Sequence, residues 1–344
     1  MSNTTGRQTM IFNNVYVKNG FSVVGPKEKE GNLGKFFDMC LENDKFGEKS
    51  FEKAECKMFK TAIDGVLKKS GTPPSDIDTV LGGDLLNQIV SASFAMREYD
   101  SSFLGLYNAC GTFAESLLLG SCLIGGEFKH KVVCISGSHF STAERQYRYP
   151  LELGVLRSPV SQWTATGSGA TLLTDNPKDA ECRITRGTAG RVTDFGIKDV
   201  NNMGAAMAPA ACDTLMQFFY DTGALPCDYD RIFTGDLGKL GKRLLAELMD
   251  GNGMNIDDKL YDCGAMLYKD RQQTYQGGSG AACSAVVFNS YILDALRNGK
   301  FKKILLVGTG ALLSTLTSFQ GESVPSIAHC LEVIACGGMF CKLF

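Results

Sequence analysis

The sequence predicts an α/β protein made of two similar halves, and three observations support this. Short apolar runs flanked by glycine, typical of buried strands, alternate with longer stretches that have helical periodicity. An internal repeat links the first half of the chain to the second. The length of 344 residues exceeds the size at which a single core stops growing, about 250–300 residues. We therefore expect two domains, residues 1–180 and 181–344, with helices covering parallel sheets.

The strands and helices follow from the spacing of apolar residues. Runs of buried-strand character are Thr79–Gly82, Val132–Ser136, Ala170–Leu173, Arg231–Thr234, Ala285–Phe288 and Ile304–Val307. Stretches with apolar residues at helical spacing are Phe51–Lys69, Ala211–Tyr220, Lys239–Met249 and Tyr291–Asn298. Because the two kinds of segment alternate, a parallel sheet with helical crossovers is expected in each half.

The internal repeat consists of two matches that occur in the same order. The matching pairs are DIDTVLGGDL (Asp76–Leu85) with DYDRIFTGDL (Asp228–Leu237), and FKHKVVCISG (Phe128–Gly137) with FKKILLVGTG (Phe301–Gly310). Between the two matches, each copy has an Ala-Cys pair, at Cys110 and at Cys283. Two such copies would pack as one layered α/β body, with the boundary between them near Pro177–Ile184.

Composition excludes several classes of protein. A hydrophobic content of 44% with 21% charged residues is ordinary for a globular protein. The formal charge of −2 provides no overall field for binding nucleic acid. The 13 cysteines are scattered through apolar segments without zinc-type spacing, which fits a cytoplasmic-type reducing environment. No apolar stretch approaches the roughly 18–20 residues that span a bilayer, so we expect any membrane contact to be peripheral.

The segment LYNACGTFAESLLLG (Leu106–Gly120) places Cys110 in a turn of small residues just before an apolar helix. The positive end of a helix favours a thiolate or a bound anion, so Cys110 is a candidate functional residue. The alternative is a buried, inert cysteine that packs as a small hydrophobic side chain.

An alanine-cysteine pair that opens a helix in the first half of a duplicated α/β protein resembles the nucleophile elbow of thiolases and ketoacyl synthases. This resemblance implies a thiolase-like fold, with two duplicated halves in a layered α-β-α-β-α body. It also implies a histidine and an asparagine from the second half that activate the cysteine. This sequence has Gly235 or Asp236 at the expected histidine position and Gly278 at the asparagine position. We therefore expect a protein that is not an enzyme.

Five longer motifs resemble the stage V sporulation protein AD family. They are GPKEKEGNLG (Gly25–Gly34), GDLLNQ (Gly83–Gln88), SGSHFSTAERQYRYP (Ser136–Pro150), MGAAMAPAACDT (Met203–Thr214) and QGGSGAACSAVV (Gln276–Val287). The resemblance implies non-catalytic binding of dipicolinic acid, pyridine-2,6-dicarboxylate, which moves with calcium into the developing spore. It implies a peripheral position at the inner spore membrane, with integral membrane proteins of the same spore channel as partners. The likeness to thiolases further implies a homodimer.

The expected ligand site is the former acyl pocket around the cysteine. Its residues are Cys110, Asp84, Asn87, His139, Arg145, Gly278 and Ser279. Arg145, with Arg148, lies in the loop predicted after the GSH motif and could pair with the carboxylates of the ligand. His139, Asp84 and Asn87 follow predicted strands, where α/β folds place ligand groups.

Each of these assignments has an alternative. The two arginines could form surface ion pairs with Glu144 or Glu152, His139 could be structural, and Asp84 could cap the next helix. No cofactor is expected; calcium could bind with the ligand, but the sequence defines no metal site.

Two other functions remain open at this point. The protein could be a residual acyltransferase or thioesterase that uses Cys110, with Asp236 or His329 as its base. Alternatively, it could be a scaffold that docks membrane partners and binds no small molecule.

Overall fold

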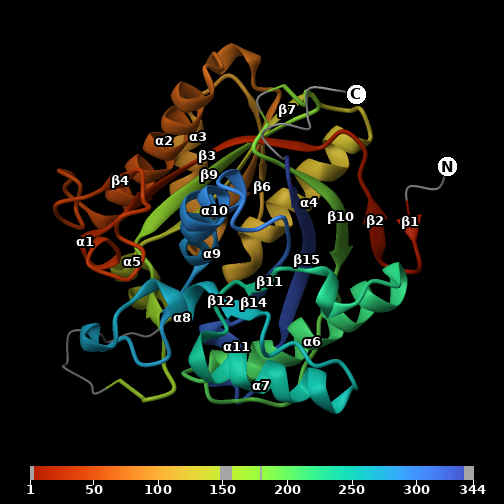
Figure 1. Cartoon of the computed structure of the whole chain (residues 1–344). Helices are drawn as coiled ribbons and strands as arrows, with labels where there is room; N and C mark the ends of the chain where they lie inside the picture. The colour runs from red at the N-terminus through yellow and green to blue at the C-terminus, as the bar shows by residue number, and fades with distance from the viewer. Residues whose placement is uncertain (1–3, 148–156, 179, 337–344) are drawn as a thin grey trace.

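The computed structural model describes residues 4–147, 157–178 and 180–336 (Figure 1). Within these ranges, none of the helices has the length and apolar character required to cross a membrane. Five of the six predicted strands are confirmed, and all four predicted helices coincide with helical segments.

A large mixed sheet forms the framework of the protein. Its main strands are β3 (Tyr16–Val24), β5 (Thr79–Gly83), β6 (Ser102–Gly105), β7 (Lys131–Ser138), β9 (Gly167–Thr174), β10 (Cys182–Ala189), β11 (Arg231–Thr234), β12 (Leu260–Asp262), β14 (Lys303–Ala311) and β15 (Ser326–Ala335). Shorter strands are β1 (Thr4–Thr5), β2 (Thr9–Ile11) and β4 (Met39–Cys40), and a separate pair consists of β8 (Trp163–Thr164) and β13 (Gly278–Ser279).

The strand order is β12-β11-β14-β15-β10-β3-β9-β7-β5-β6, and each half of this order mirrors the other. β5 runs parallel to β6 and β7, as β11 does to β12 and β14. β9 is antiparallel to β7, as β15 is to β14. The strands of the sequence repeat therefore occupy matching places. The halves meet where β10 pairs with β3; the domain boundaries 1–180 and 181–344 stay a prediction.

The helices form three layers around the two halves of the sheet. They are α1 (Pro26–Lys29), α2 (Phe51–Ser70), α3 (Val90–Met96), α4 (Thr112–Gly125), α5 (Phe140–Tyr147), α6 (Met203–Thr222), α7 (Gly238–Gly251), α8 (Cys263–Leu267), α9 (Ala281–Val287), α10 (Leu293–Arg297) and α11 (Thr315–Phe319). α2 covers the outer face of β3 and β9, and α6 covers β14 and β15. α4 lies between the halves and contacts β5 and β7 on one side and β14 and β15 on the other. The predicted layered α-β-α-β-α arrangement is confirmed.

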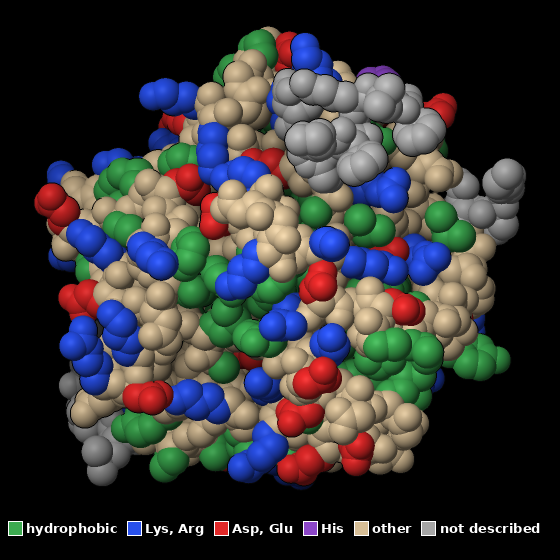
Figure 2. All heavy atoms as spheres, viewed as in Figure 1, with side chains coloured by type: hydrophobic (Ala, Val, Ile, Leu, Met, Phe, Trp, Pro, Cys, Tyr) green, Lys and Arg blue, Asp and Glu red, His purple; other side chains and the backbone are tan. Residues whose placement is uncertain are grey.

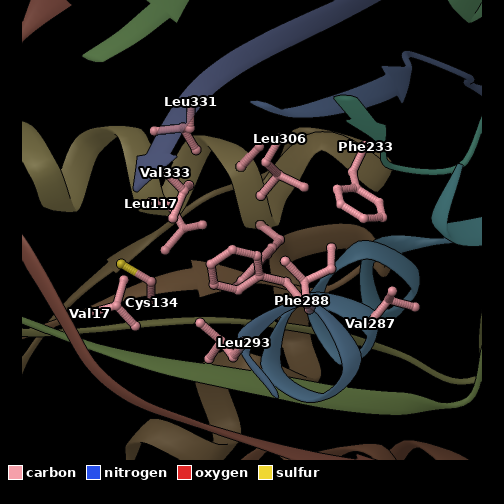
Figure 3. Close-up of a cluster of buried hydrophobic side chains, with 14 of the residues drawn as sticks. Val17, Leu117, Cys134, Phe233, Val287, Phe288, Leu293, Leu306, Leu331 and Val333 are labelled. Carbon is pink, nitrogen blue, oxygen red and sulfur yellow. The ribbon is translucent and has the colours of Figure 1, made fainter. Parts of the chain in front are cut away.

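The largest hydrophobic cluster fills the middle layer (Figure 3). Leu117 of α4 lies among Leu331 and Val333 of β15, and Phe288 follows α9 directly. The rings of Phe113 and Phe288 lie 5.6 Å apart, which joins the two middle helices. Separate clusters lie beneath α2 and beneath α6. The middle cluster therefore holds the two halves together.

The prediction of a strand at Ala285–Phe288 is wrong. These residues belong to α9 and to the π-helical turn Phe288–Ile292 that continues it. All four are completely buried, because α9 lies in the middle layer. A helix that is apolar on every side has no amphipathic period, so a short buried helix and a buried strand have the same sequence pattern.

Candidate functional site

Cys110 lies in a short turn, Ala109–Gly111, that leads from β6 into α4. Ala109 has a φ of 48°, an uncommon conformation for a residue other than glycine. The Thr112 hydroxyl donates to the Ala109 carbonyl at 2.8 Å and accepts from the Asn108 amide at 3.2 Å. The turn is therefore held on both sides, and it fixes the cysteine at the start of the helix.

Two glycines of β14 allow this turn to approach the second half closely. A Cβ atom at Gly308 would lie 2.3 Å from Cβ of Ala114, and one at Gly310 would lie 2.7 Å from the Asn108 carbonyl oxygen. Neither distance leaves room for a larger side chain without movement of the helix. The VGTG sequence of β14 is thus required for the packing of the elbow.

Asp236 organises the opposite wall of the site. Its Oδ2 accepts hydrogen bonds from the Ser279 hydroxyl and the Gly280 amide, both at 3.0 Å, and its Oδ1 accepts one from Thr309 at 3.1 Å. Ser279 Oγ lies 3.8 Å from Cys110 Sγ. Burial raises the pKa of Asp236 to about 6.

The same surroundings keep the Cys110 thiol protonated. Burial raises its pKa well above the ordinary value, and the neighbouring charge of Asp236 raises it further. Reactive cysteines are found in the opposite environment, near cations or an imidazolium.

The segment Gly277–Gly280 is fixed by Gln162 as well. Its Nε2 donates to the carbonyl oxygens of Asp236 at 2.7 Å and Gly278 at 2.9 Å. Gly278 and Ser279 form β13, which pairs with Trp163 and Thr164. Gly278 and Ser279 therefore lie in a short, anchored strand.

Cys110 opens onto a small space between the two halves, here called the inner cavity, of about 50 Å³. Ala143, Glu144 and Tyr147 of α5 line it from the first half, and Met203 and Ser279 line it from the second. One water occupies about 30 Å³ in the liquid, so the inner cavity by itself is smaller than an aromatic ligand.

A larger space, the outer bowl, adjoins the inner cavity and has a volume of about 390 Å³. Both spaces are lined by Ala109, Tyr147, Ala311 and Leu313, so they adjoin at this wall. The volume of the outer bowl falls within the range of about 300–1,000 Å³ that small-molecule sites occupy.

Polar groups of the outer bowl form one network. The Tyr147 hydroxyl donates to the Leu85 carbonyl at 2.6 Å and lies 3.0 Å from the Tyr107 hydroxyl. The Tyr107 hydroxyl also lies 3.3 Å from Oδ1 of Asn87, whose backbone amide donates to Gln146 at 3.0 Å. Sequence reasoning missed Tyr107, Gln146 and Tyr147, although Ala143 and Tyr147 have the i, i+4 spacing of one helix face.

Three of the predicted site residues line these spaces. Cys110 and Ser279 line the inner cavity, and Asn87 lines the outer bowl. Asp84 lies apart, with its two carboxylate oxygens accepting from the backbone amides of Leu86 at 2.8 Å and Ala92 at 2.7 Å. This geometry corresponds to the alternative in which Asp84 caps the next helix. A ligand role for Asp84 stays a prediction.

His139 and Arg145 also have protein partners. His139 Nε2 lies 2.8 Å from the Asp44 carbonyl oxygen, and Nδ1 accepts from the Ser141 amide at 3.1 Å. Burial lowers the pKa of His139, which favours the neutral form of the ring. Arg145 pairs with Glu52 and belongs to α5, where the sequence predicted a loop. The second candidate, Arg148, lies outside the described residues.

His329, the other candidate base, lies on β15 behind the elbow. Its Nε2 is 3.1 Å from the Asn108 side-chain amide, and its Nδ1 accepts from the Gly190 amide at 3.2 Å. Burial lowers the pKa of His329 to about 4. The contact with Asn108 makes His329 a support of the elbow.

Solved structures of low sequence identity share this fold. Acetamide-bound OleA from Xanthomonas campestris matches with a TM-score of 0.61 and 14% identity, covering 94% of this chain and 100% of the other. The 3-oxoacyl-[acyl-carrier-protein] synthase III from Aquifex aeolicus VF5 matches with a TM-score of 0.57 and 12% identity, covering 93% and 99%. The predicted thiolase-like fold is confirmed.

The sequence itself gives a more specific match. The family model for stage V sporulation protein AD covers residues 6–334. Stage V sporulation protein AD of Bacillus subtilis (strain 168) is 41% identical over 335 residues, 97% of this chain and 98% of that protein. The chain therefore belongs to the stage V sporulation protein AD family, and it has a thiolase-like fold around the elbow of Cys110.

Proposed function

We propose that this sporulation protein binds dipicolinate without catalysis, in the outer bowl and the inner cavity at Cys110. It would act as the peripheral component of a spore channel that loads dipicolinate during sporulation. The observation that carries the proposal is the placement of Cys110, in an inner cavity that adjoins the ligand-sized outer bowl but beside a buried carboxylate. In such an arrangement the pocket of an acyl-transfer fold is still present, but the thiolate form of Cys110, which would be the nucleophile, is disfavoured.

The energetics at Cys110 support a binding role. The N-terminus of α4 stabilises a thiolate by at most about 2 kcal/mol, or about 1.5 pKa units. Burial and Asp236 act in the opposite direction and raise the pKa of Cys110. Among the described residues that line the inner cavity, none is a histidine that could accept the thiol proton. We infer that histidine and asparagine partners of the enzymatic relatives have been replaced in this chain.

The outer bowl suits a flat ligand with two carboxylates. The rings of Tyr107 and Tyr147 provide apolar surface, and their hydroxyls and the Asn87 amide provide hydrogen-bonding groups. Within the described part of the chain, the lining of the bowl includes neither lysine nor arginine. A dianion buried without a cation is costly, so we expect calcium, carried with the ligand, to strengthen binding.

The partners are proposed to be dipicolinate and the integral membrane proteins of the channel, with no nucleic acid. The face seen in Figure 2 carries positive and negative side chains interspersed. The formal charge of −2 agrees with this mixture. Attachment at the inner spore membrane would then depend on protein partners more than on a uniform charge.

Calorimetric titration with dipicolinate, with and without calcium, tests the proposal. We expect one-to-one binding that is lost in Cys110→Phe, which fills the inner cavity, and weakened in Asn87→Ala. Tyr220→Ala is a suitable control, because Tyr220 is 83% exposed and lines neither space. Absence of binding at millimolar dipicolinate would refute the proposal and favour a scaffold that binds no small molecule.

A residual acyltransferase or thioesterase is the second candidate, since Cys110 at a helix N-terminus opens onto a cavity. Mass spectrometry after incubation with acyl-coenzyme A separates the two functions. An acyl adduct on Cys110 would support catalysis, and we expect none.

A further inference from the structure

A second concave site lies on the outer layer, away from Cys110. Here called the α2–α3 groove, it runs between α2 and α3 and has a volume of about 460 Å³. Its lining includes Lys53, Cys56, Lys57, Lys60, Phe94 and Arg97. None of these residues lines the inner cavity or the outer bowl.

The charges of the groove do not cancel. Lys57 lies 3.5 Å from Glu48, and Lys60 lies 2.8 Å from Glu98. The remaining carboxylate of the lining, Glu52, pairs with Arg145 outside the groove. Within the described residues, Lys53 and Arg97 have no carboxylate partner, so two positive charges stay uncompensated.

Arg97 lies in a geometry that suits a planar anion. Its guanidinium carbon is 4.2 Å from the centre of the Phe94 ring, and its Nε donates to the Phe94 carbonyl at 3.3 Å. The two terminal nitrogens of Arg97 have no acceptor in the part of the chain that the structure describes. A guanidinium held this way presents two parallel N–H donors, the arrangement that matches a carboxylate.

The groove also offers apolar surface beside these cations. Phe94 is 49% exposed, so part of its ring is open to a ligand. Val90 and the half-buried Cys56 continue this surface across the groove. A ligand with both a ring and a charge would contact this apolar surface as well as the cations, whereas inorganic phosphate would contact the cations alone.

We propose that the α2–α3 groove binds a planar aromatic carboxylate. The ring packs on Phe94 and Val90, and the carboxylate pairs with Arg97 and Lys53. This site is independent of the proposed function at Cys110 and does not require it.

Cys56 makes the groove directly testable, because its thiol lies in the lining. Burial raises the pKa of Cys56, so alkylation by N-ethylmaleimide is slow and can be followed at mildly alkaline pH. Exposed Cys227 is the internal control. The probe is isophthalate, a planar dicarboxylate without the ring nitrogen that chelates calcium.

Peptide mass spectrometry would measure the alkylation rates of both cysteines as isophthalate is added. We expect slower alkylation of Cys56 with unchanged alkylation of Cys227, and a loss of this protection at high salt. Arg97→Gln should weaken the protection by about tenfold, as expected for loss of a charge-assisted hydrogen bond. Arg243→Gln, at an exposed arginine of α7, should leave it unchanged.

Two further variants make the outcome decisive. Lys53→Gln replaces Arg97→Gln if the latter fails to fold, and Cys110→Phe should retain the protection of Cys56. Equal effects on Cys56 and Cys227, or no protection at saturating isophthalate, would overturn the proposed groove site. Loss of protection in Cys110→Phe would overturn its independence, whereas dipicolinate titration at the outer bowl tests the other proposal separately.

Discussion

Glu28→Gln should remove a large part of the pH dependence of stability. Glu28 belongs to α1 and is 1% exposed. Its Oε1 accepts from the Thr166 amide at 3.1 Å and from the Tyr268 hydroxyl. Burial outweighs these hydrogen bonds and raises the pKa of Glu28 from 4.5 to about 7.

The sign of the effect follows from proton binding. Between pH 4.5 and about 7 the folded protein holds a proton on Glu28 that the unfolded chain has released. The contribution of Glu28 to the free energy of unfolding therefore falls as pH rises through this window, and it is constant above the window. At 1.36 kcal/mol per pKa unit, the whole change amounts to about 3 kcal/mol. Glutamine retains an acceptor oxygen for Thr166 and Tyr268 but does not titrate.

Urea unfolding followed by circular dichroism, from about pH 5 to about pH 8, measures this difference. The free energy of unfolding of the variant should change less across this range, by up to about 3 kcal/mol. Asp84 and Asp236, with pKa values raised to about 6, contribute a slope of the same sign in both proteins. Glu247→Gln, at a 66% exposed side chain, is the matched control. An unchanged pH dependence in Glu28→Gln would refute the reasoning.

The remaining predictions concern the core and the assembly. Phe288→Ala removes a buried ring from the middle layer and should reduce the free energy of unfolding by about 3–5 kcal/mol. Phe128→Ala is the control: its ring is 76% exposed, so the free energy of unfolding should change by less than about 0.5 kcal/mol. Urea denaturation measures both changes. We propose a homodimer in which β6, at one end of the sheet, pairs with its copy. Leu104→Lys should then shift sedimentation toward the monomer while Leu225→Lys does not; a wild-type monomer at all concentrations would exclude this assembly.

Much of the fold could be predicted because local pattern and global topology agree. The apolar runs at Thr79–Gly82 and Arg231–Thr234 correspond to β5 and β11, which hold matching places in the sheet. Phe51–Lys69 has one apolar face and forms α2 almost to the residue. The pattern failed at Ala285–Phe288, since residues buried on all sides carry no period.

The site was only partly predictable, because strand ends locate an edge of the sheet but not the direction of a side chain. Cys110, Ser279 and Asn87 line the two spaces. Asp84 and His139 follow strands as expected, yet both accept hydrogen bonds from backbone amides two residues further along the chain. Such local hydrogen bonds depend on turn geometry that a strand pattern does not specify.

The duplication also explains why only one of the two cysteines can serve a ligand site. Cys110 and Cys283 occupy matching places in the repeat, each near the start of a middle helix. Cys283 is completely buried and its thiol donates to the Gly235 carbonyl at 3.6 Å, whereas Cys110 lines the inner cavity. Burial raises the pKa of both thiols, and the neighbouring charge of Asp236 raises it further. The Asp236 carboxylate, from the second copy, thus disfavours the thiolate of both cysteines. Because Cys283 is completely buried and Cys110 lines the inner cavity, Cys110 is the one of the two that a ligand can reach.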